Sequence, residues 1–512
     1  MRRFYTTILF SILLTGTISA IEVSGDIWGT WSPENNPYEI VGQAHVPHES
    51  TLMILPGCYI EFQNYCRIEI DTMAVFQAIG AIDDSIYFVS PDTSIIWNAL
   101  DFYNADSNSF LAYCVIDGGF GSYSGALTIN NTSMTIANCF IKNCEGFIGG
   151  AGIYLKHSNI IINSTKLYNN NTAIYGGGIY CDSSTLTVSN CVIDSNRSHL
   201  TTYVYTYGGG ICCQYSDVTI RDNLFVNNMC HYQGGAICLQ HCTGLITNNI
   251  ISNNVSKSIG GGIAIGYDSD VEISYNLITS NEARYSGVGS GGGGIYLGDS
   301  TQAEIFNNTI CNNYARGDGG GVLAHFDDDK FFYNIIWGNT AYYGDDQITL
   351  SDESDSSIII YCDIEGDWPG DTNIDADPLF CDSTNGDYYL AANSPCIGSG
   401  YEGDNIGIYG IGCEPTSMDD YASLPEGFQL LQNYPNPFNE STAIKFELPN
   451  QSFVTIDIYD ILGRKITTLI NGNQSAGSHQ LIWYAGDISS GVYFYKIQAN
   501  GYNEMRKMIL LK

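Results

Sequence analysis

The amino-acid sequence predicts an all-β protein in two parts, a long coil of stacked parallel strands followed by a small β-sandwich. Charged residues make up 14% of the chain, against roughly 25% in ordinary globular domains, whereas Gly (56) and Tyr (37) are abundant. A repeat of about 26 residues fills the middle of the chain, and it stops after residue 413. Helical surfaces normally need Lys, Glu and Arg, so this composition favours strands.

The first 20 residues have the order of a secretory signal peptide. Arg2 and Arg3 precede the apolar run 8–14, and small residues follow up to Ala20. This run is too short to span a bilayer, and no later stretch is long enough. A buried N-terminal strand is the alternative, but the order of charge before apolar run favours export. We therefore expect cleavage near Ala20.

A glycine cluster followed by an aliphatic residue marks each repeat unit. The intervals between these markers are 26, 32, 26, 26, 32 and 27 residues, so six-residue insertions interrupt a unit of 26. The markers are Ile153, Ile179, Ile211, Ile237, Ile263, Ile295 and Val322.

Each unit reads as three short strands separated by corners, for example 178–181, 186–188 and 191–193. No unit can bury its own apolar side chains, so successive units must stack with like strands in register, about 4.8 Å apart. The residue two positions after each marker then forms an inward column. This column is Leu155, Cys181, Cys213, Leu239, Ile265, Leu297 and Ala324.

Asparagine recurs at two further positions of the unit, where it can tolerate left-handed backbone and stack as an amide ladder. The first set precedes an apolar pair and comprises Asn138, Asn190, Asn223, Asn249, Asn276, Asn308 and Asn334. The residues two positions later, from Phe140 and Val192 to Ile336, are expected to point inward. The second set closes the same strand and comprises Asn196, Asn228, Asn254, Asn281, Asn313 and Asn339.

The chain has 17 Cys, an odd number for an exported protein. The repeat places several of them in the core, where a free thiol behaves as a small hydrophobe. Cys212 and Cys238 point outward on neighbouring turns. They can pair, although stacked strands do not always offer the geometry of a disulfide.

These repeats resemble the right-handed parallel β-helix of the pectate-lyase-like superfamily, over roughly residues 40–410. The segment 51–62 resembles the first turns of such proteins, and 373–397 resembles the end that closes many bacterial members. The resemblance implies three strands per turn within residues 21–413. It does not fix a function, because many activities share one fold.

The segment after residue 413 has a different organisation. Residues 414–427 contain Pro, Ser and Asp and read as a linker. Alternating strands follow at 443–448, 454–459, 480–483 and 492–497, which predicts a small immunoglobulin-like β-sandwich over 428–512.

Four motifs of this tail resemble the type A sorting domain of type IX secretion. They are NYPNPFN (433–439), IYDILGR (458–464), GVYFY (491–495) and KMILLK (507–512). The resemblance implies recognition by the type IX secretion machinery and transfer to the outer-membrane surface or the exterior of a Gram-negative cell. Whether the tail is removed, and the protein anchored or released, stays open.

The net charge of −35 limits the classes of partner. Residues 21–413 contain 44 Asp and Glu but only 10 Lys and Arg. Nucleic acid and anionic lipid both favour clustered basic residues, so neither is an expected partner. We expect no transmembrane segment and a monomeric chain.

No catalytic residues can be assigned from the sequence. A lyase or glycosidase of this fold needs Arg or Lys beside acidic groups, or two carboxylates flanking the bond that is broken. The basic residues of the repeats fall in different columns. The alternative of a polysaccharide lyase or glycoside hydrolase stays open.

Three aromatic residues, Tyr215, His241 and Tyr267, share one column four positions after the aliphatic marker. An exposed aromatic strip can stack against sugar rings, but an aromatic ladder can also simply cover the face of the coil. We treat these residues as candidate glycan-binding residues.

Two acidic groups are candidates for cation binding. Asp268, Asp299 and Asp327 lie at similar positions of successive turns, where stacked carboxylates need solvent, a raised pKa or a cation. Asp371, Asn373, Asp375 and Asp377 place oxygen ligands at alternate positions, as a calcium loop does. Solvated corners and simple turns are the alternatives. Calcium is the only cofactor that the sequence suggests.

The sequence thus predicts an exported, surface-attached or secreted protein that binds glycans or other extracellular matter without cleaving them. The identity of the ligand does not follow from the residues.

Overall fold

A computed structural model describes residues 20–510, apart from gaps at 93–94, 122–123, 199–204, 286, 288, 326–328, 351–356, 367, 371, 415–426, 434, 440, 451, 462, 475–476 and 487. The chain divides into two compact units. The first contains the residues up to Pro378 together with Pro395–Gly410, and the second contains Leu379–Ser394 and Ile411–Lys512. The residues of the predicted signal peptide before residue 20 and most of the predicted linker lie outside the described residues.

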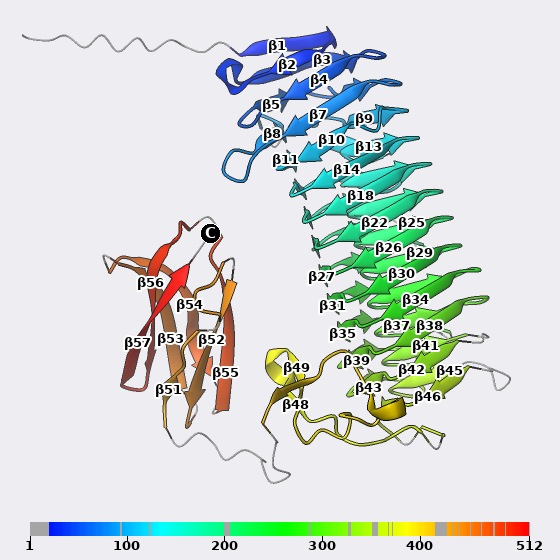
Figure 1. Ribbon diagram of the computed structural model, residues 1–512, viewed down its shortest axis with the longest axis vertical. Helices are drawn as coiled ribbons and strands as arrows, with labels where there is room; N and C mark the ends of the chain where they lie inside the picture. The colour runs from blue at the N-terminus through cyan, green and yellow to red at the C-terminus, as the bar shows by residue number, and fades with distance from the viewer. Residues whose placement is uncertain are drawn as a thin grey trace, which may run out of the picture. The chain divides into compact units, whose positions relative to one another are not determined.

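The first unit is a right-handed β-solenoid with about 26 residues per turn, as the sequence predicts (Figure 1). Every strand pairs in parallel with the same strand of the next turn, and three long ladders result. The first ladder follows the glycine corner and contains β6 (Ile68–Ile70), β9 (Leu100–Tyr103), β13 (Leu127–Asn130), β17 (Ile153–Lys156), β21 (Ile179–Asp182), β25 (Ile211–Gln214), β29 (Ile237–Gln240), β33 (Ile263–Gly266), β37 (Ile295–Leu297), β41 (Val322–Ala324) and β45 (Ile348–Leu350).

The second ladder comes next along each turn. It contains β2 (Gly29–Trp31), β4 (Thr51–Ile54), β7 (Val75–Ile79), β10 (Phe110–Ala112), β14 (Ser133–Ala137), β18 (Asn159–Asn163), β22 (Thr185–Ser189), β26 (Asp217–Arg221), β30 (Thr243–Thr247), β34 (Asp270–Ser274), β38 (Gln302–Phe306), β42 (Lys330–Phe332) and β46 (Ile358–Ile360).

The third ladder completes the turn. It contains β5 (Tyr59–Phe62), β8 (Ile86–Val89), β11 (Cys114–Asp117), β15 (Phe140–Lys142), β19 (Lys166–Tyr168), β23 (Val192–Asp194), β27 (Leu224–Val226), β31 (Ile250–Ser252), β35 (Leu277–Thr279), β39 (Thr309–Cys311), β43 (Ile335–Trp337) and β47 (Asp363–Ile364). Strands β1 (Ile21–Asp26) and β3 (Tyr38–Val46) join the first and third ladders at the start of the coil.

A minor ladder of two-residue strands lies between the third ladder and the glycine corner. It contains β12 (Phe120–Gly121), β16 (Glu145–Gly146), β20 (Asn171–Thr172), β24 (Arg197–Ser198), β28 (Met229–Cys230), β32 (Val255–Ser256), β36 (Glu282–Ala283), β40 (Tyr314–Ala315) and β44 (Thr340–Ala341). Single 3₁₀ turns occur at Pro33–Asn35, Ser383–Asn385 and Tyr401–Gly403.

The glycine corners allow successive turns to approach closely. Gly176 has φ +52°, and a Cβ added at Gly177 would lie 2.4 Å from the backbone N of Arg197. A larger residue therefore cannot replace Gly177 without moving the next turn. The insertions leave the strand register unchanged, because Ile179 pairs with Ile211 although 32 residues separate them.

The interior of the coil is apolar, and the predicted inward column from Leu155 to Ala324 is buried along its whole length. The second predicted inward column is buried from Phe225 to Ile336, but the prediction is wrong at its first two positions. Phe140 and Val192 are only partly buried, and their neighbours Ile141 and Ile193 fill the core instead. The reason is that Asn138 and Asn190 are the left-handed corner residues (both φ 54°), one position before the ladder.

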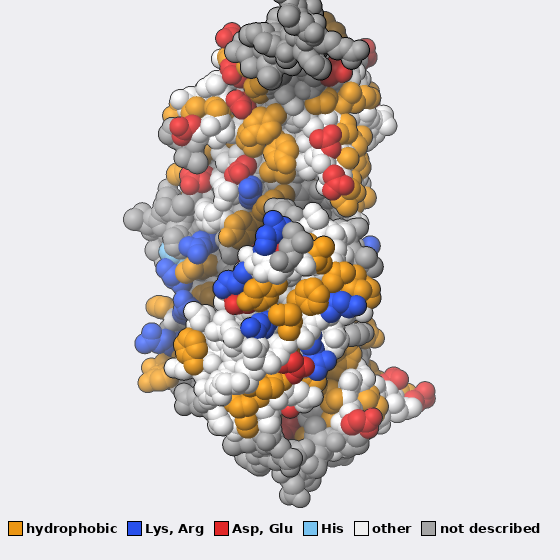
Figure 2. Space-filling view, turned by 90° about the vertical axis from the view of Figure 1, so that its left-hand side faces the viewer, with side chains coloured by type: hydrophobic (Ala, Val, Ile, Leu, Met, Phe, Trp, Pro, Cys, Tyr) orange, Lys and Arg blue, Asp and Glu red, His pale blue; other side chains and the backbone are white. Residues whose placement is uncertain are grey.

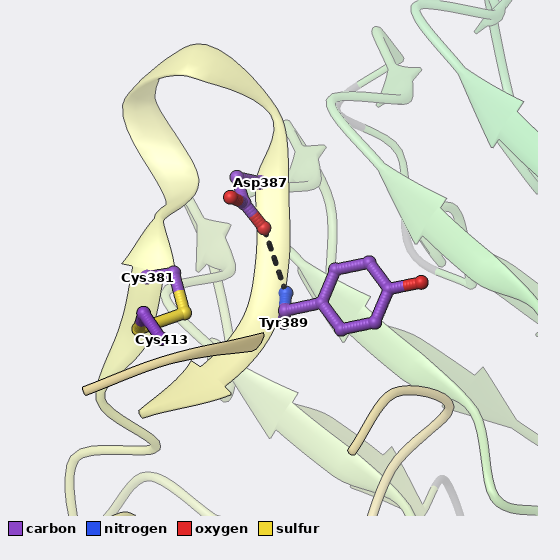
Figure 3. The surroundings of a disulfide bond; sticks show 4 residues. All are labelled: Cys381, Asp387, Tyr389 and Cys413. Atoms are coloured by element: carbon purple, nitrogen blue, oxygen red, sulfur yellow. Dashed lines mark hydrogen bonds between the residues drawn. A yellow bond between two sulfur atoms is a disulfide. The ribbon is translucent and has the colours of Figure 1, made fainter. Parts of the chain in front are cut away.

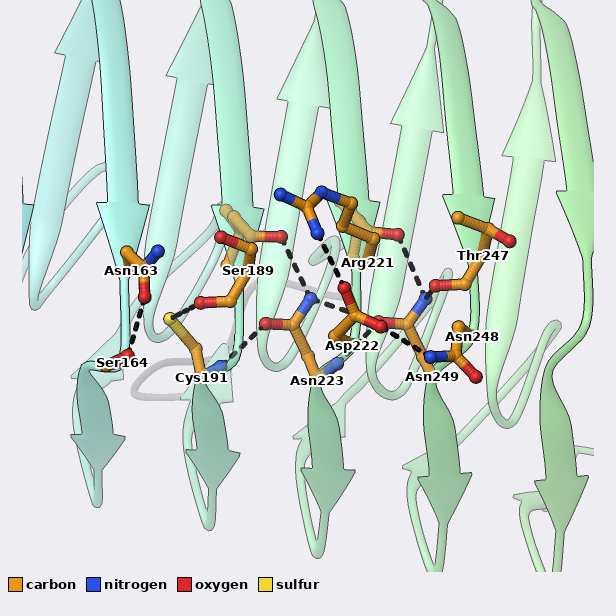
Figure 4. A network of polar contacts seen from close by, with 12 residues as sticks. Asn163, Ser164, Ser189, Cys191, Arg221, Asp222, Asn223, Thr247, Asn248 and Asn249 are labelled. Carbon is orange, nitrogen blue, oxygen red and sulfur yellow. Dashed lines mark hydrogen bonds and ion pairs between the residues drawn. The ribbon is translucent and has the colours of Figure 1, made fainter.

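The asparagine column that closes the third strand is a continuous buried ladder, as predicted. The Asn170 amide donates to Asn196 Oδ1 (2.9 Å) and the Asn196 amide donates to Asn228 Oδ1 (3.0 Å), and the same bond recurs as far as Asn339. A second ladder starts where Cys191 N donates to Asn223 Oδ1 (2.8 Å), and Asn223 then donates to Asn249 (3.0 Å), as Figure 4 shows. These amides satisfy corner N–H groups that water cannot reach.

The second unit contains two separate sets of strands. A three-stranded sheet comprises β48 (Phe380–Asp382), β49 (Asp387–Ala391) and β50 (Ile411–Cys413), and the disulfide between Cys381 and Cys413 joins its outer strands (Figure 3). The sequence predicts the boundary between the parts at residue 413, whereas this sheet groups with the tail. The other 15 Cys, all within the described residues, are buried and form no disulfide, and Cys212 and Cys238 are among them.

The tail forms a small sandwich. One sheet contains β51 (Gln429–Leu430), β52 (Ser441–Leu448) and β55 (Gly477–Tyr484), and the other contains β54 (Lys465–Gln474), β53 (Ser452–Asp460), β56 (Gly491–Ala499) and β57 (Tyr502–Leu510). Figure 2 shows Lys and Arg side chains gathered in the middle of the view, over this sandwich. Among the described residues, no helix is long and apolar enough to cross a membrane.

The sorting motifs build the interior of the sandwich. Tyr495 is fully buried, and its hydroxyl donates to Leu431 O (2.7 Å) and accepts from Asn433 N (2.8 Å). The Asn433 amide in turn donates to Thr442 Oγ1 (2.9 Å) and to Pro435 O (3.1 Å). Asn433 and Tyr495 therefore tie the two ends of the tail together.

Candidate binding surface

The three aromatic residues of the predicted column lie in one stack on the outside of the first ladder. Tyr215, His241 and Tyr267 each follow the end of a strand, and their φ angles are 52°, 52° and 53°. The Tyr215 and His241 rings are 4.7 Å apart and within 3° of parallel, and the His241 and Tyr267 rings are 5.7 Å apart at 22°. We call this stack the aromatic ladder.

Because the rings of the aromatic ladder are stacked, only some of their faces can contact a ligand. The rings are stacked from one turn to the next, so the inner faces cover one another, and a sugar ring can stack only at an end. The residue of the preceding turn at this position is Ser183, which is small. Tyr215 is accordingly 61% exposed, and Tyr267 at the other end is 46% exposed.

A second group of aromatic side chains lies beside the same strands, at the glycine corner, and we call it the tyrosine cluster. Its members are Tyr154, Tyr175, Tyr180, Tyr207 and Tyr232. Tyr175 stacks on Tyr180 (4.9 Å) and on Tyr207 (5.3 Å), and Tyr207 meets Tyr232 edge to face (5.7 Å). The cluster covers the buried thiols of Cys212 and Cys238.

Three glutamines connect the two aromatic groups, and we call them the amide relay. The Tyr180 hydroxyl donates to Gln214 Oε1 (2.7 Å), and Gln214 Nε2 donates to Gln240 Oε1 (2.7 Å). Gln240 Nε2 then donates to Gln233 Oε1 (2.8 Å). Gln214 and Gln240 directly precede Tyr215 and His241, while Gln233 pairs with Tyr207 across the corner.

The phenols of the tyrosine cluster stay protonated at neutral pH. Burial raises the pKa of Tyr180 well above its usual value, and the neighbouring Cys212 and Asp182 raise it further. Burial also raises the pKa of Tyr207, and the phenol of Tyr267 adds to this effect. The surface therefore presents neutral hydroxyl groups, which both donate and accept hydrogen bonds.

The tyrosine cluster is not predicted from the sequence, although one signal of it is present there. The segment Tyr-Gly-Gly-Gly occurs twice, at 175–178 and 207–210, one repeat apart. The cluster draws its members from the glycine corner and from the strand, so no single column of the repeat contains all of them.

The predicted acidic column stays a prediction, and two of its three residues lie within the described residues. Asp268 faces His241, with 3.6 Å between Oδ2 and Nδ1, and Asp299 is an exposed residue of the following turn. Asp327 lies outside the described residues.

One predicted ligand of the calcium loop, Asn373, makes hydrogen bonds to the backbone of the coil. Asn373 Oδ1 accepts from Cys362 N (3.0 Å), and its amide donates to Ile359 O (2.9 Å) and Pro369 O (3.1 Å). Asp371 lies outside the described residues, and Asp375 and Asp377 lie close enough to raise the pKa of the buried Asp363. Calcium binding here stays a prediction.

A cluster of charged side chains that the sequence does not predict lies near the start of the coil, on the outer face of the first ladder. Arg67 lies 3.0 Å from Glu69 and 3.3 Å from the nearly buried Asp101, measured between charged atoms. Burial raises the pKa of Asp101, although Thr128 and Arg67 partly offset this. His45 lies between Asp26 (3.3 Å) and Asp71 (3.1 Å) on the adjoining turn.

Comparison with known proteins gives two matches. Residues 93–251 match the family model described as the right handed beta helix region, and residues 432–511 match the one described as the secretion system C-terminal sorting domain. No curated protein and no solved structure matches the chain.

Proposed function

We propose that this chain, a right-handed parallel β-helix followed by a type IX sorting domain, binds polysaccharide outside the cell or at its surface without cleaving it. The sorting domain directs the chain through type IX secretion to the exterior or the cell surface. The finer statement, that the β-helix binds a glycan, depends on the aromatic surface.

The observation that best supports the proposal is the exposed ring of Tyr215 at the end of the aromatic ladder. Tyr215 is 61% exposed, and its outer ring face looks over Ser183. An aromatic face of this kind pairs with the apolar face of a pyranose ring, while nearby hydroxyl and amide groups bind the hydroxyls at its edge. The parallel stacking of Tyr215 on His241 fixes the ring, so little side-chain entropy is lost on binding.

A second candidate function, polysaccharide cleavage, is favoured by the Arg67 cluster. A carboxyl group whose pKa is raised by burial, beside a second carboxylate, is an arrangement that acid–base catalysis uses. However, Arg67 already faces two carboxylates, so its charge is largely neutralised before any substrate arrives. Binding without cleavage is therefore the better-supported function.

The experiment uses the purified, exported chain and a panel of neutral and acidic polysaccharides. Binding is measured by affinity electrophoresis, and cleavage by the release of reducing ends. We expect binding without cleavage, and we expect the double variant Tyr215→Ala/Tyr267→Ala to bind roughly thirtyfold more weakly, because stacking of this kind contributes about 1 kcal/mol per ring.

Tyr275→Ala is the matched control. Tyr275 also sits at a left-handed corner (φ 51°) and is 45% exposed, but it belongs to the corner after the second ladder. Its variant should bind like the wild type. Equal binding by the double variant would refute the proposal, and cleavage that disappears in Asp101→Asn would establish the second candidate in its place.

A further inference from the structure

We infer that the ligand of this surface is an uncharged glycan that binds between the aromatic ladder and the tyrosine cluster. The amide relay forms hydrogen bonds with its hydroxyl groups. This inference rests on the proposed function and names the class of ligand. It assigns binding to the tyrosine cluster and the relay, which the aromatic ladder alone does not require.

The relay has the chemistry of a hydroxyl-binding site. Each internal bond of the relay uses one N–H of an amide and one lone pair of a carbonyl oxygen. A side-chain amide has two N–H groups and two such lone pairs, so Gln214 keeps one of each for a ligand. Gln214 is partly exposed, whereas Gln233 and Gln240 are about 5% exposed. Gln214 is thus the member that a ligand can reach.

The relay also has a fixed direction. Donation runs from Tyr180 through Gln214 and Gln240 to Gln233, so each amide is oriented before a ligand binds. Such pre-ordering favours a ligand that supplies both donors and acceptors at regular intervals. The hydroxyl groups of a sugar do so, and carboxylate or sulfate groups offer acceptors only.

The charged groups beside the surface are already paired. Lys156 lies 3.4 Å from Asp182, and His241 lies 3.6 Å from Asp268. Lys257 contacts the imidazole of His231 (2.8 Å), the residue before Tyr232 of the tyrosine cluster. The surrounding coil carries 44 acidic residues and 10 basic ones, so it repels an anionic polymer.

The two aromatic groups are close enough to act on one ligand. Gln240 directly precedes His241 of the aromatic ladder, and its amide donates to Gln233 Oε1 (2.8 Å). Gln233 in turn directly follows Tyr232 and pairs with Tyr207, both members of the tyrosine cluster. A sugar chain can therefore contact a ring on each side and an amide between them.

The test compares the full-length chain with its variants on soluble oligosaccharides. The neutral probes are β-1,4-glucan, β-1,3-glucan and mannan hexamers, and the acidic probes are polygalacturonate and alginate hexamers. We expect the wild type to bind a neutral probe, with an affinity that changes little between low and high salt. Gln214→Ala should lower that affinity roughly three- to tenfold, and Tyr207→Ala by a similar factor.

Two further variants make the result interpretable. Gln214→Glu keeps the shape of the side chain but cannot donate to Gln240, so it should weaken binding as much as Gln214→Ala does. It tests the hydrogen bond separately from any effect of Gln214→Ala on folding. Gln302→Ala, at the exposed start of β38 in the second ladder, should bind like the wild type.

The outcomes separate this inference from the proposed function. If only acidic probes bind, with strong salt dependence and loss in the Tyr215→Ala/Tyr267→Ala variant, glycan binding stands and the inference is overturned. Unchanged affinity in Gln214→Glu and Tyr207→Ala, with loss in that double variant, also overturns it. If neither class of probe binds, both the proposed function and the inference fail.

Discussion

At the scale of single residues, the interior of the coil contains groups that water would normally surround. Asp363 is fully buried, where its Oδ1 accepts from Ala376 N (3.2 Å) and its Oδ2 accepts from the thiol of Cys396 (2.8 Å). Burial raises the pKa of this carboxyl from 3.8 to about 7, and Asp375 and Asp377 add to the shift. The folded protein therefore holds a proton that the unfolded chain releases.

This proton makes stability depend on pH. The folded-state pKa is raised, so the folded state keeps the proton between about pH 4 and pH 7 while the unfolded chain loses it, and stability falls as pH rises through this window. Asp363→Asn should remove most of this slope. At pH 8 it should raise the free energy of unfolding by at most roughly 4 kcal/mol relative to wild type, with little difference near pH 4. Denaturant unfolding from pH 4 to pH 9 measures this, and parallel pH profiles for the two proteins would contradict it.

At the scale of elements, the asparagine ladders form hydrogen bonds with buried backbone groups that the pairing of strands does not satisfy. Asn254 is fully buried, and its amide donates to Phe225 O, Ser252 O and Asn281 Oδ1, each at 3.0 Å. Its Oδ1 accepts from both the backbone N (3.0 Å) and the amide (2.9 Å) of Asn228. One residue thus satisfies polar groups on three turns.

Replacing Asn254 should therefore be costly. Asn254→Ala leaves several buried groups without a partner, each worth about 1–3 kcal/mol, so we expect the free energy of unfolding to fall by about 3–5 kcal/mol. Asn159, exposed at the start of β18, is the control, and its alanine variant should change stability by less than about 0.5 kcal/mol. A loss at Asn254 no larger than at Asn159 would show that the ladder contributes little.

The sequence predicts elements well where one position repeats along the chain. The column from Leu155 to Ala324 and the ladder from Asn196 to Asn339 follow from spacing alone, because every turn imposes its register on the next. The inward prediction at Phe140 and Val192 fails for a local reason. A left-handed corner residue can be Asn or Asp, so the Asn of the corner and the Asn of the ladder look alike in sequence.

The functional surface is less predictable for a different reason. The aromatic ladder occupies one column and was predicted, whereas the tyrosine cluster and the amide relay combine the strand with the corner before it. Arg67, Glu69 and Asp101 lie in early turns where the glycine marker is absent. The Cys381–Cys413 pairing was not predicted, since sequence does not reveal which cysteines meet.

At the scale of the whole molecule, the β-helix and the sorting domain each have a core of their own. The sandwich has its own core, which includes Phe446, Ile456, Trp483 and Tyr495. The coil has another core that runs from Val23 to Ile364. Because the two cores share no residue, loss of the tail should leave the coil folded.

This separation predicts the fate of a truncated chain. Deletion of 427–512 should leave a folded β-helix inside the cell envelope, because the exported chain needs the sorting domain for its last step. Cell fractionation with protease protection measures its location, and circular dichroism of the purified fragment measures its folding. The full-length Tyr215→Ala chain is the control and should reach the exterior. Normal export of the truncated chain would refute the role given to the tail.

The constant register across the glycine corner has a practical consequence for protein engineering. Ile179 pairs with Ile211, and Ile263 pairs with Ile295, although both intervals contain six extra residues. Extra residues at this corner therefore leave the strands on either side unaltered. Tyr205 at this corner is 61% exposed, so foreign peptides inserted beside it should be displayed on the outside of the coil, and export would carry them to the cell exterior as epitopes on a rigid scaffold.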